Sequence, residues 1–152
     1  MARPRLALAA LALALVASSG CAVGGIVDWM DLRGHRHRLE DTQRKYVRLL
    51  RWGEYDAASF FVSDDVREAF RHDIADFGAV RFTDYEILDT EINELQTEAD
   101  ILVSYRAYHT SYLVEYAWSE RQKWHRDVAS NAWTVKPDLE QLRGALAVMR
   151  PQ

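Results

Sequence analysis

The stretch ADILVSYRAY, residues 99–108, decides the fold class. Its apolar side chains recur at every second position, and alternate residues of an extended strand point to the same face. The run lies between polar segments, as half-buried strands usually do. It therefore predicts a strand whose inner face carries Ile101, Val103, Tyr105 and Ala107.

Runs with the same period of two lie on both sides of this strand. Upstream, VRFTDYEIL (residues 80–88) is expected to place Asp84 and Glu86 on the face of Phe82. Downstream, SYLVEYAWSERQKW (residues 111–124) is long for a strand, which predicts a bend or a bulge within it. TVK follows a polar turn. Short polar connections of this kind predict an antiparallel sheet of about four strands.

Helical spacing dominates the rest of the chain. Apolar residues recur at three and four from Leu39 to Trp52, where Gly53 is a typical helix end. A second short helix and a third, capped by Ser63, follow before the strands. The last segment, residues 137–149, predicts a C-terminal helix that packs on its own domain or on a partner protein.

Helices followed by antiparallel strands form an α+β plan. Three pieces, YVRLLRWGEYDAASFFV, VRFTDYEIL and RQKWHRDVASNAWTV, resemble the nuclear transport factor 2-like superfamily, and the resemblance runs from about Leu39 to Lys136. This superfamily has the cystatin-like cone, and it includes ketosteroid isomerases and small bacterial lipoproteins. The resemblance implies N-terminal helices packed on a bent antiparallel sheet, here with an extra C-terminal helix. The cone interior is then a ligand pocket or a filled core.

The start of the chain indicates export. Arg3 and Arg5 precede an apolar run from Leu6 to Val16, and small residues follow it. A basic start, a short apolar run and a small-residue exit are typical of a secretory signal peptide. The run is too short to span a bilayer, which takes about 20 residues. We expect residues 1–20 to be a signal peptide.

The only cysteine, Cys21, follows these small residues in LVASSGCAVGG. This arrangement resembles the lipobox of bacterial lipoproteins, in which the thiol is acylated and the peptide is cut before the cysteine. Lipid chains contribute about 0.8 kcal/mol per buried CH₂, so two or more hold a protein on a membrane. The alternatives are a free thiol or an intermolecular disulfide. Ala22, which is not Asp, resembles the sorting signal for the outer membrane, facing the periplasm.

We therefore divide the chain into a lipoprotein signal peptide (1–20), a lipidated cysteine with a tether (21–38) and one α+β domain (39–152). The net charge of −4 lacks the basic excess of nucleic-acid-binding domains. No nucleic-acid partner is expected. The expected partners are the lipid membrane, through acylated Cys21, and an envelope protein.

Candidate site residues gather on the second and third strands. His109 and Glu115 could form a general base and its neighbour, although pairs of charged residues are also common on the exposed faces of hairpins. The aromatic residues could line a pocket, pave a binding surface or simply fill the core. The candidate pocket or surface residues are Tyr105, His109, Tyr112, Glu115, Tyr116 and Trp118.

The remaining motifs predict neither a metal nor a cofactor. His35 and His37 form an H-x-H pair without the third and fourth ligands that a metal site needs. No nucleophile elbow, phosphate loop, zinc signature or calcium loop is present. The first hypothesis is a non-enzymatic, membrane-anchored binding or scaffold module. The alternative is a small-molecule-binding or enzymatic cone of the ketosteroid-isomerase-like type.

Overall fold

A computed structural model of the 152-residue chain describes residues 22–149, with side chains from residue 34 onward. The predicted signal peptide and Cys21 lie outside the described residues. The chain divides into two units at His37, within the first described helix, α2 (Ala22–Trp52). The fold below is that of the second unit.

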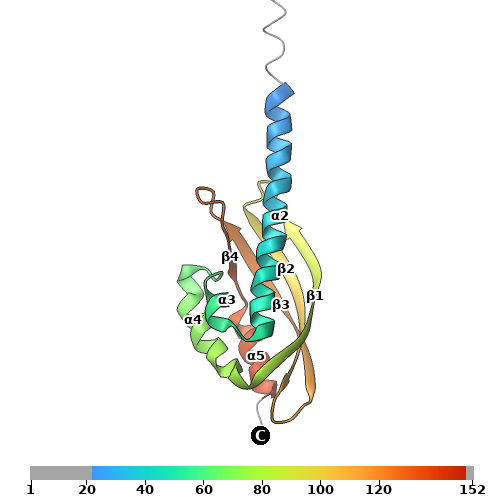
Figure 1. Ribbon diagram of the computed structural model, residues 1–152, viewed down its shortest axis with the longest axis vertical. Coiled ribbons are helices and arrows are strands. Elements are labelled where there is room, and N and C mark those ends of the chain that lie inside the picture. The colour runs from blue at the N-terminus through green and yellow to red at the C-terminus, as the bar shows by residue number, and fades with distance from the viewer. Residues whose placement is uncertain (1–21, 150–152) are drawn as a thin grey trace, which may run out of the picture. The chain divides into compact units, whose positions relative to one another are not determined.

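The helices precede a four-stranded antiparallel sheet (Figure 1). The short α3 (Tyr55–Ser59), α4 (Asp64–Ala75) and a 3-10 turn, η1 (Asp76–Ala79), follow α2. The strands come next and pair in chain order, and the chain ends in a helix. They are β1 (Val80–Ile92), β2 (Glu98–His109), β3 (Glu115–Arg126), β4 (Trp133–Lys136) and α5 (Leu139–Met149). The predicted α+β class, with its extra C-terminal helix, is confirmed.

One face of the sheet packs against the helices and forms the core. From His37 onward, α2 buries an apolar face, and the ring of its Tyr46 meets Trp124 of β3 edge-on at 5.9 Å. Phe70 of α4 lies on the other side of Tyr46, with ring centroids 6.4 Å apart. The 3-10 turn adds Phe77, which stacks on Phe82 of β1 at 5.9 Å. Burial of these side chains is the main stabilising term of the domain.

One predicted helix end is confirmed and two differ. Ser63 lies at the N-cap position of α4, but its side chain makes no capping hydrogen bond. Gly53 has a φ of 73°, the left-handed conformation expected of glycine after a helix. Asp138 accepts hydrogen bonds from the N–H groups of Glu140 and Gln141, both at 3.1 Å, which caps α5. However, α2 begins at Ala22, not near Leu39. The assignment of residues 21–38 as a lipidated tether stays a prediction.

Two register shifts in β1 correct the expected positions of its acids. They lie between Phe82 and Asp84 and between Ile87 and Asp89. A bulge adds a residue to one strand and reverses the alternation beyond it. Asp84 and Glu86 are therefore exposed, and the prediction that they share the inner face of Phe82 is wrong.

Candidate functional site

Polar side chains lie at the centre of the core, on the inner faces of β2 and β3. Glu120 and Gln122 lie between the two tryptophans of β3. Tyr105 of β2 lies against them, and all three residues are at most 1% exposed. We call the four buried side chains Tyr105, Glu120, Gln122 and Trp124 the interior polar cluster.

The Gln122 amide connects this cluster. Its Nε2 donates to the hydroxyl oxygen of Tyr105 at 2.7 Å and to Oε2 of Glu120 at 3.1 Å. Its Oε1 accepts the indole N–H of Trp124 at 3.2 Å. The other carboxyl oxygen of Glu120 accepts the backbone N–H of Asp138 at 3.1 Å. Buried polar groups are costly without partners, so these bonds make the cluster compatible with the core.

Burial sets the protonation behaviour of the cluster. It raises the pKa of Glu120 from 4.5 to about 7, although hydrogen bonds from Gln122, Asp138 and Tyr105 favour the charged form. Burial, with the nearby Glu120 charge as a smaller cause, also raises the pKa values of Tyr46 and Tyr105. Glu120 is therefore the one member of the cluster that changes its charge near neutral pH.

The C-terminal helix closes the core beside this acid. It packs on α4 and β3 and buries Leu142, Leu146 and Met149. Arg121 of β3 donates its backbone N–H to Oε1 of Gln141 at 3.3 Å. A carboxylic acid with a near-neutral pKa can transfer protons. Here both carboxyl oxygens already accept hydrogen bonds within the core.

Three of the six predicted site residues lie on the inner side of the sheet. Tyr105 is buried in the cluster, whereas Tyr116 and Trp118 are half-buried. The ring of Trp118 lies 5.4 Å from that of Tyr105 and 5.6 Å from that of Phe82. The indole Nε1 of Trp118 is buried and has no hydrogen-bond partner. These aromatic rings fill the space beside Glu120.

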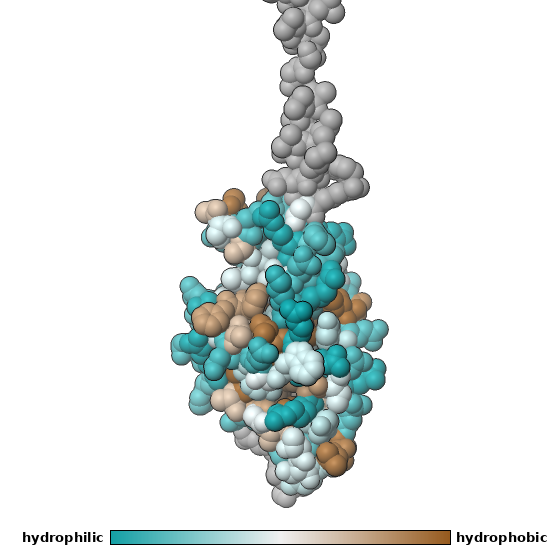
Figure 2. All heavy atoms as spheres, viewed as in Figure 1, coloured by the Kyte–Doolittle hydropathy of each residue, from teal (hydrophilic) through white to brown (hydrophobic). Residues whose placement is uncertain are grey.

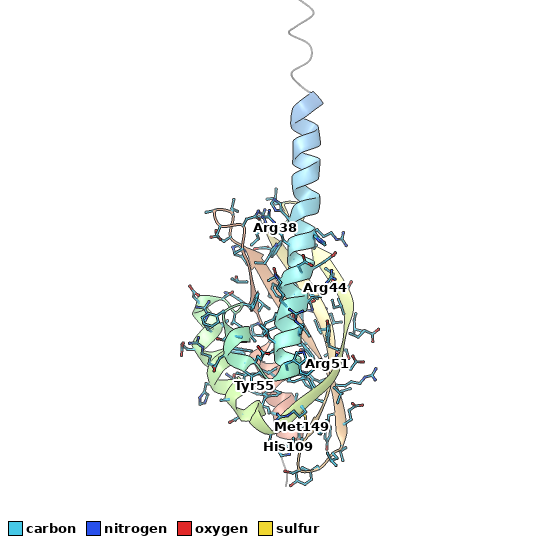
Figure 3. The ribbon with its side chains drawn as sticks, viewed as in Figure 1. Arg38, Arg44, Arg51, Tyr55, His109 and Met149 are labelled. Atoms are coloured by element: carbon cyan, nitrogen blue, oxygen red, sulfur yellow. The ribbon has the colours of Figure 1, made fainter. Side chains whose placement is uncertain are left out.

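The other three lie in or beside the β2–β3 connection, residues 109–115, which we call the tip loop. His109 accepts the backbone N–H of Ser111 on its ring Nδ1 at 3.2 Å, and its ring lies 5.6 Å from that of Tyr112. Glu115 accepts the hydroxyl of Thr83 at 2.6 Å. Figure 3 places His109 at the same end of the domain as Met149. The described bonds of His109 and Glu115 hold the loop in place.

Sequence reasoning missed Glu120 as a site residue, although a signal was present. Glu120 and Gln122 have the same parity as Trp118 and Trp124, so they lie on the buried face of a period-two run. The third strand begins at Glu115, and this places Tyr112 in a turn outside the strand. A polar pair between two tryptophans on one strand face indicates a buried polar cluster.

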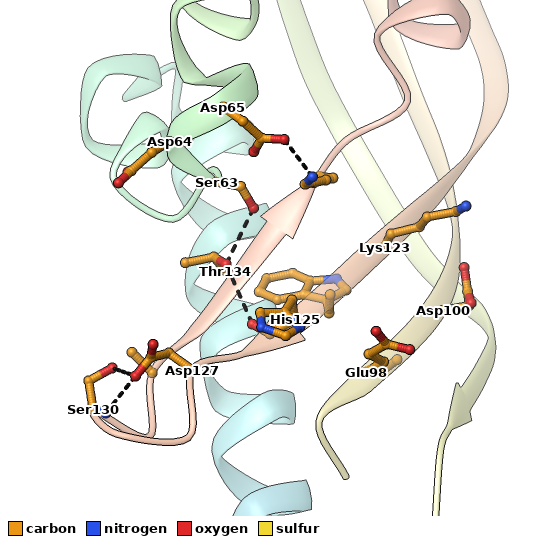
Figure 4. A pocket seen from close by; sticks show the side chains of 14 residues that line it. Ser63, Asp64, Asp65, Glu98, Asp100, Lys123, His125, Asp127, Ser130 and Thr134 are labelled. Carbon is orange, nitrogen blue, oxygen red and sulfur yellow. Dashed lines mark hydrogen bonds and ion pairs between the residues drawn. The ribbon is translucent and has the colours of Figure 1, made fainter. Parts of the chain in front are cut away.

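A separate groove of about 920 Å³ runs along the outer face of the sheet (Figure 4). Charged residues of both signs line it. Asp65 pairs with Lys136, Asp100 lies opposite Lys123 in the strand register, and Glu98 lies opposite His125. Its lining has more acids than bases, because Asp64 and Asp127 add to the three paired acids.

The described residues contain neither a candidate metal site nor a candidate membrane-spanning helix. No group of three or more His, Cys, Asp or Glu side chains gathers there in a way that could hold a metal ion. His37 of the H-x-H pair lies 3.6 Å from Asp41, one turn further along α2. No helix in the described part of the chain is long and apolar enough to span a bilayer.

Comparisons with known proteins add one similarity. No protein-family model matches the chain, and no curated protein does. One solved structure, described as a "putative polyketide cyclase" from Xanthomonas campestris pv. campestris, is 15% identical, with a TM-score of 0.47. The match covers 74% of this chain and 98% of the other. The fold assignment rests on the strand order and register of the chain itself, which define an α+β domain with a four-stranded antiparallel sheet.

Proposed function

We propose that this chain is a lipid-anchored binding module of the bacterial cell envelope that holds a protein partner through its tip loop. The acylated Cys21 would anchor it, in the outer membrane and facing the periplasm. The sequence of residues 1–21 supports the anchor. The domain would then act as a non-enzymatic binding or scaffold unit, because the described bonds of Glu120 and the packing of α5 close its interior.

One observation carries the proposal of a binding tip. Tyr112, Leu113 and Val114 are consecutive and at least 50% exposed. Single apolar residues are ordinary on protein surfaces, but contiguous ones mark interaction sites more often. Figure 2 shows that the face in view is largely hydrophilic, with apolar side chains in small separate groups. An exposed run of three is therefore distinctive on this domain.

The backbone of the tip loop is already ordered for binding. The carbonyl of His109 accepts N–H groups from Tyr112 at 3.0 Å and Leu113 at 3.1 Å, and Thr110 donates to the carbonyl of Ala79 at 2.9 Å. Leu113 adopts a φ of 52°, which costs about 1–2 kcal/mol for a residue with a Cβ. Such strain concentrates at functional positions, and a preformed loop loses less entropy on binding.

Site-specific photo-crosslinking of the full lipidated chain in its native membrane tests this proposal. The crosslinker replaces Leu113 in one variant and, as a matched control, Val128 in another; Val128 is exposed to a similar degree on the β3–β4 hairpin. We expect one protein adduct from position 113 that position 128 does not give. The adduct partner, once purified, should bind Leu113→Asn at least about tenfold more weakly, because one leucine loses its burial. Adducts to lipid alone, or the same adducts from both positions, would contradict the proposal.

The alternative is a small-molecule-binding or enzymatic cone of the ketosteroid-isomerase-like type. The near-neutral pKa of Glu120 and the unpartnered indole N–H of Trp118 favour it. It requires the core beside Glu120 to open and admit a ligand. A small-molecule adduct that co-purifies with the natural protein and is lost in Glu120→Gln would support this alternative over a closed binding module.

A further inference from the structure

Glu120 is a buried carboxyl group without a cationic partner. It is 1% exposed, and no Lys, Arg or His among the described residues forms an ion pair with it. Its described partners are the neutral donors Gln122, Tyr105 and the backbone N–H of Asp138. An ionised carboxylate in such a place loses its hydration without gaining a countercharge.

This carboxyl group lies at the N-terminal end of α5. Asp138, whose N–H bonds Oε1 of Glu120, directly precedes the first residue of the helix. Only Pro137 and Asp138 connect β4 to α5, so the polar contact is made at the point where the helix would pivot. A change at Glu120 therefore acts at the attachment of the helix. This hydrogen bond favours the charged form of Glu120, but burial of the carboxyl group is the larger cause and opposes it.

The remaining attachments of α5 are few. Three apolar side chains, Leu142, Leu146 and Met149, are buried along one face. Arg143 pairs with Asp73 of α4 at 2.9 Å, and this pair raises the pKa of Arg143, so the arginine stays charged at all relevant pH values. Glu120, whose pKa is about 7, therefore supplies the contact of α5 that changes charge near neutral pH.

The groups around Glu120 come from each element packed against it. Tyr46 of α2 and Tyr105 of β2 have raised pKa values and are neutral near pH 7. Gln122 of β3 is uncharged. The side chain of Asp138 opposes ionisation of Glu120, although it also accepts N–H groups from the first turn of α5. None of these groups offers a positive charge to compensate Glu120.

We propose that α5 is a pH-sensitive lid on the core of the domain, docked while Glu120 holds its proton and opened more readily once the proton is lost. This inference goes beyond the proposed function, and it is independent of the tip loop and of its partner. Opening would expose the Glu120 carboxyl group to water, where its charged form is stable.

The direction of the pH dependence follows from proton linkage. In the closed state the pKa of Glu120 is raised to about 7, and an open, hydrated state brings it back toward 4.5. Between these values the closed state binds more protons, so opening releases a proton and becomes more favourable as the pH rises. If the shift is fully relieved on opening, the opening constant rises about tenfold from pH 6 to pH 8.

Hydrogen exchange of the full chain, followed by mass spectrometry at pH 6 and pH 8 and corrected for intrinsic exchange rates, tests the lid. We expect amides of α5 to lose about tenfold protection in the wild-type protein and, at both pH values, to be much less protected than amides of β2, because α5 opens while the sheet stays folded. Glu120→Gln should abolish this difference, and Glu140→Gln, a change of an exposed acid on α5, should retain it.

Three results would overturn the proposal. They are equal protection of α5 at both pH values, protection of α5 as high as that of β2, which would mean that α5 opens only by global unfolding, and the wild-type pH response persisting in Glu120→Gln. If Glu120→Gln does not fold, the amide protection of α5 and of β2 in the wild-type protein still tests whether α5 opens separately from the sheet.

Discussion

The interior polar cluster and the tip loop are built on the same two strands, but their polarities are reversed. The cluster places Glu120 and Gln122 in the middle of the core, where apolar residues are usual, and the tip exposes Leu113, where polar residues are usual. The cluster is closed by hydrogen bonds and by α5. The tip loop is held by backbone hydrogen bonds, but its apolar side chains are exposed to solvent. One region therefore governs stability and its pH dependence, and the other is free to bind.

The largest expected effect is in the interior. Trp124→Ala removes a buried ring that meets Tyr46 and also leaves Oε1 of Gln122 without its donor. We expect a loss of about 3–5 kcal/mol in the free energy of unfolding, measured by guanidinium denaturation. A loss below about 1 kcal/mol would show that the interior is not tightly packed, and the comparison with the tip would fail.

The second effect concerns whether α5 belongs to the core. Leu142→Ala empties a site that is 2% exposed, whereas Val148 on the same helix is 63% exposed. We expect Leu142→Ala to cost about 2–4 kcal/mol and Val148→Ala to stay within about 0.5 kcal/mol, both by urea denaturation. Equal, small effects would place α5 outside the folded core and favour docking on a partner protein.

The third effect separates the two regions by pH. Folded Glu120 has a pKa of about 7 against 4.5 in its ordinary state, so the folded protein binds more protons between these values. Its contribution to stability is therefore lost as the pH rises, by about 2 kcal/mol from pH 5 to pH 8. Urea denaturation across this range measures the free energy of unfolding of the wild-type protein and of Glu120→Gln. The difference between the two proteins should show that loss. If the difference in the free energy of unfolding between the two proteins does not vary with pH, the raised pKa of Glu120 is contradicted.

The smallest effect is at the tip. Leu113→Asn removes an exposed side chain and substitutes a residue that tolerates positive φ, so stability should change by less than about 1 kcal/mol, toward stabilisation. Thermal unfolding measures it, with Val128→Asn as the control. A large destabilisation would mean that Leu113 supports the fold, and its exposure would then say nothing about binding.

The strands followed from the sequence because periodicity reports local burial. The period-two run of residues 99–108 predicted β2, and the helical spacing of residues 137–149 predicted α5. The bulges of β1 were not predictable, because they depend on pairing with β2 and leave no local mark. They moved Asp84 from the expected inner face to the surface.

The candidate site was predicted in part. Tyr105 and Trp118 were named and do meet in the interior, but Glu120, which lies between them and α5, was not. Its burial could have been read from the period-two run, but its bond to Asp138, 18 residues further along the chain, has no local signal. His109 and Glu115 were named as a general base and its neighbour and Tyr112 as an aromatic pocket or surface residue, whereas the exposed Leu113 and Val114 were not named.

Native mass spectrometry of the full lipidated chain, gently extracted from its own membrane, tests the central claim most directly. The account predicts no small-molecule adduct and a protein adduct that is lost in Leu113→Asn and kept in Val128→Asn. A small-molecule adduct that survives Leu113→Asn but disappears in Glu120→Gln would contradict it, because the interior would then be the binding site and the tip only a turn.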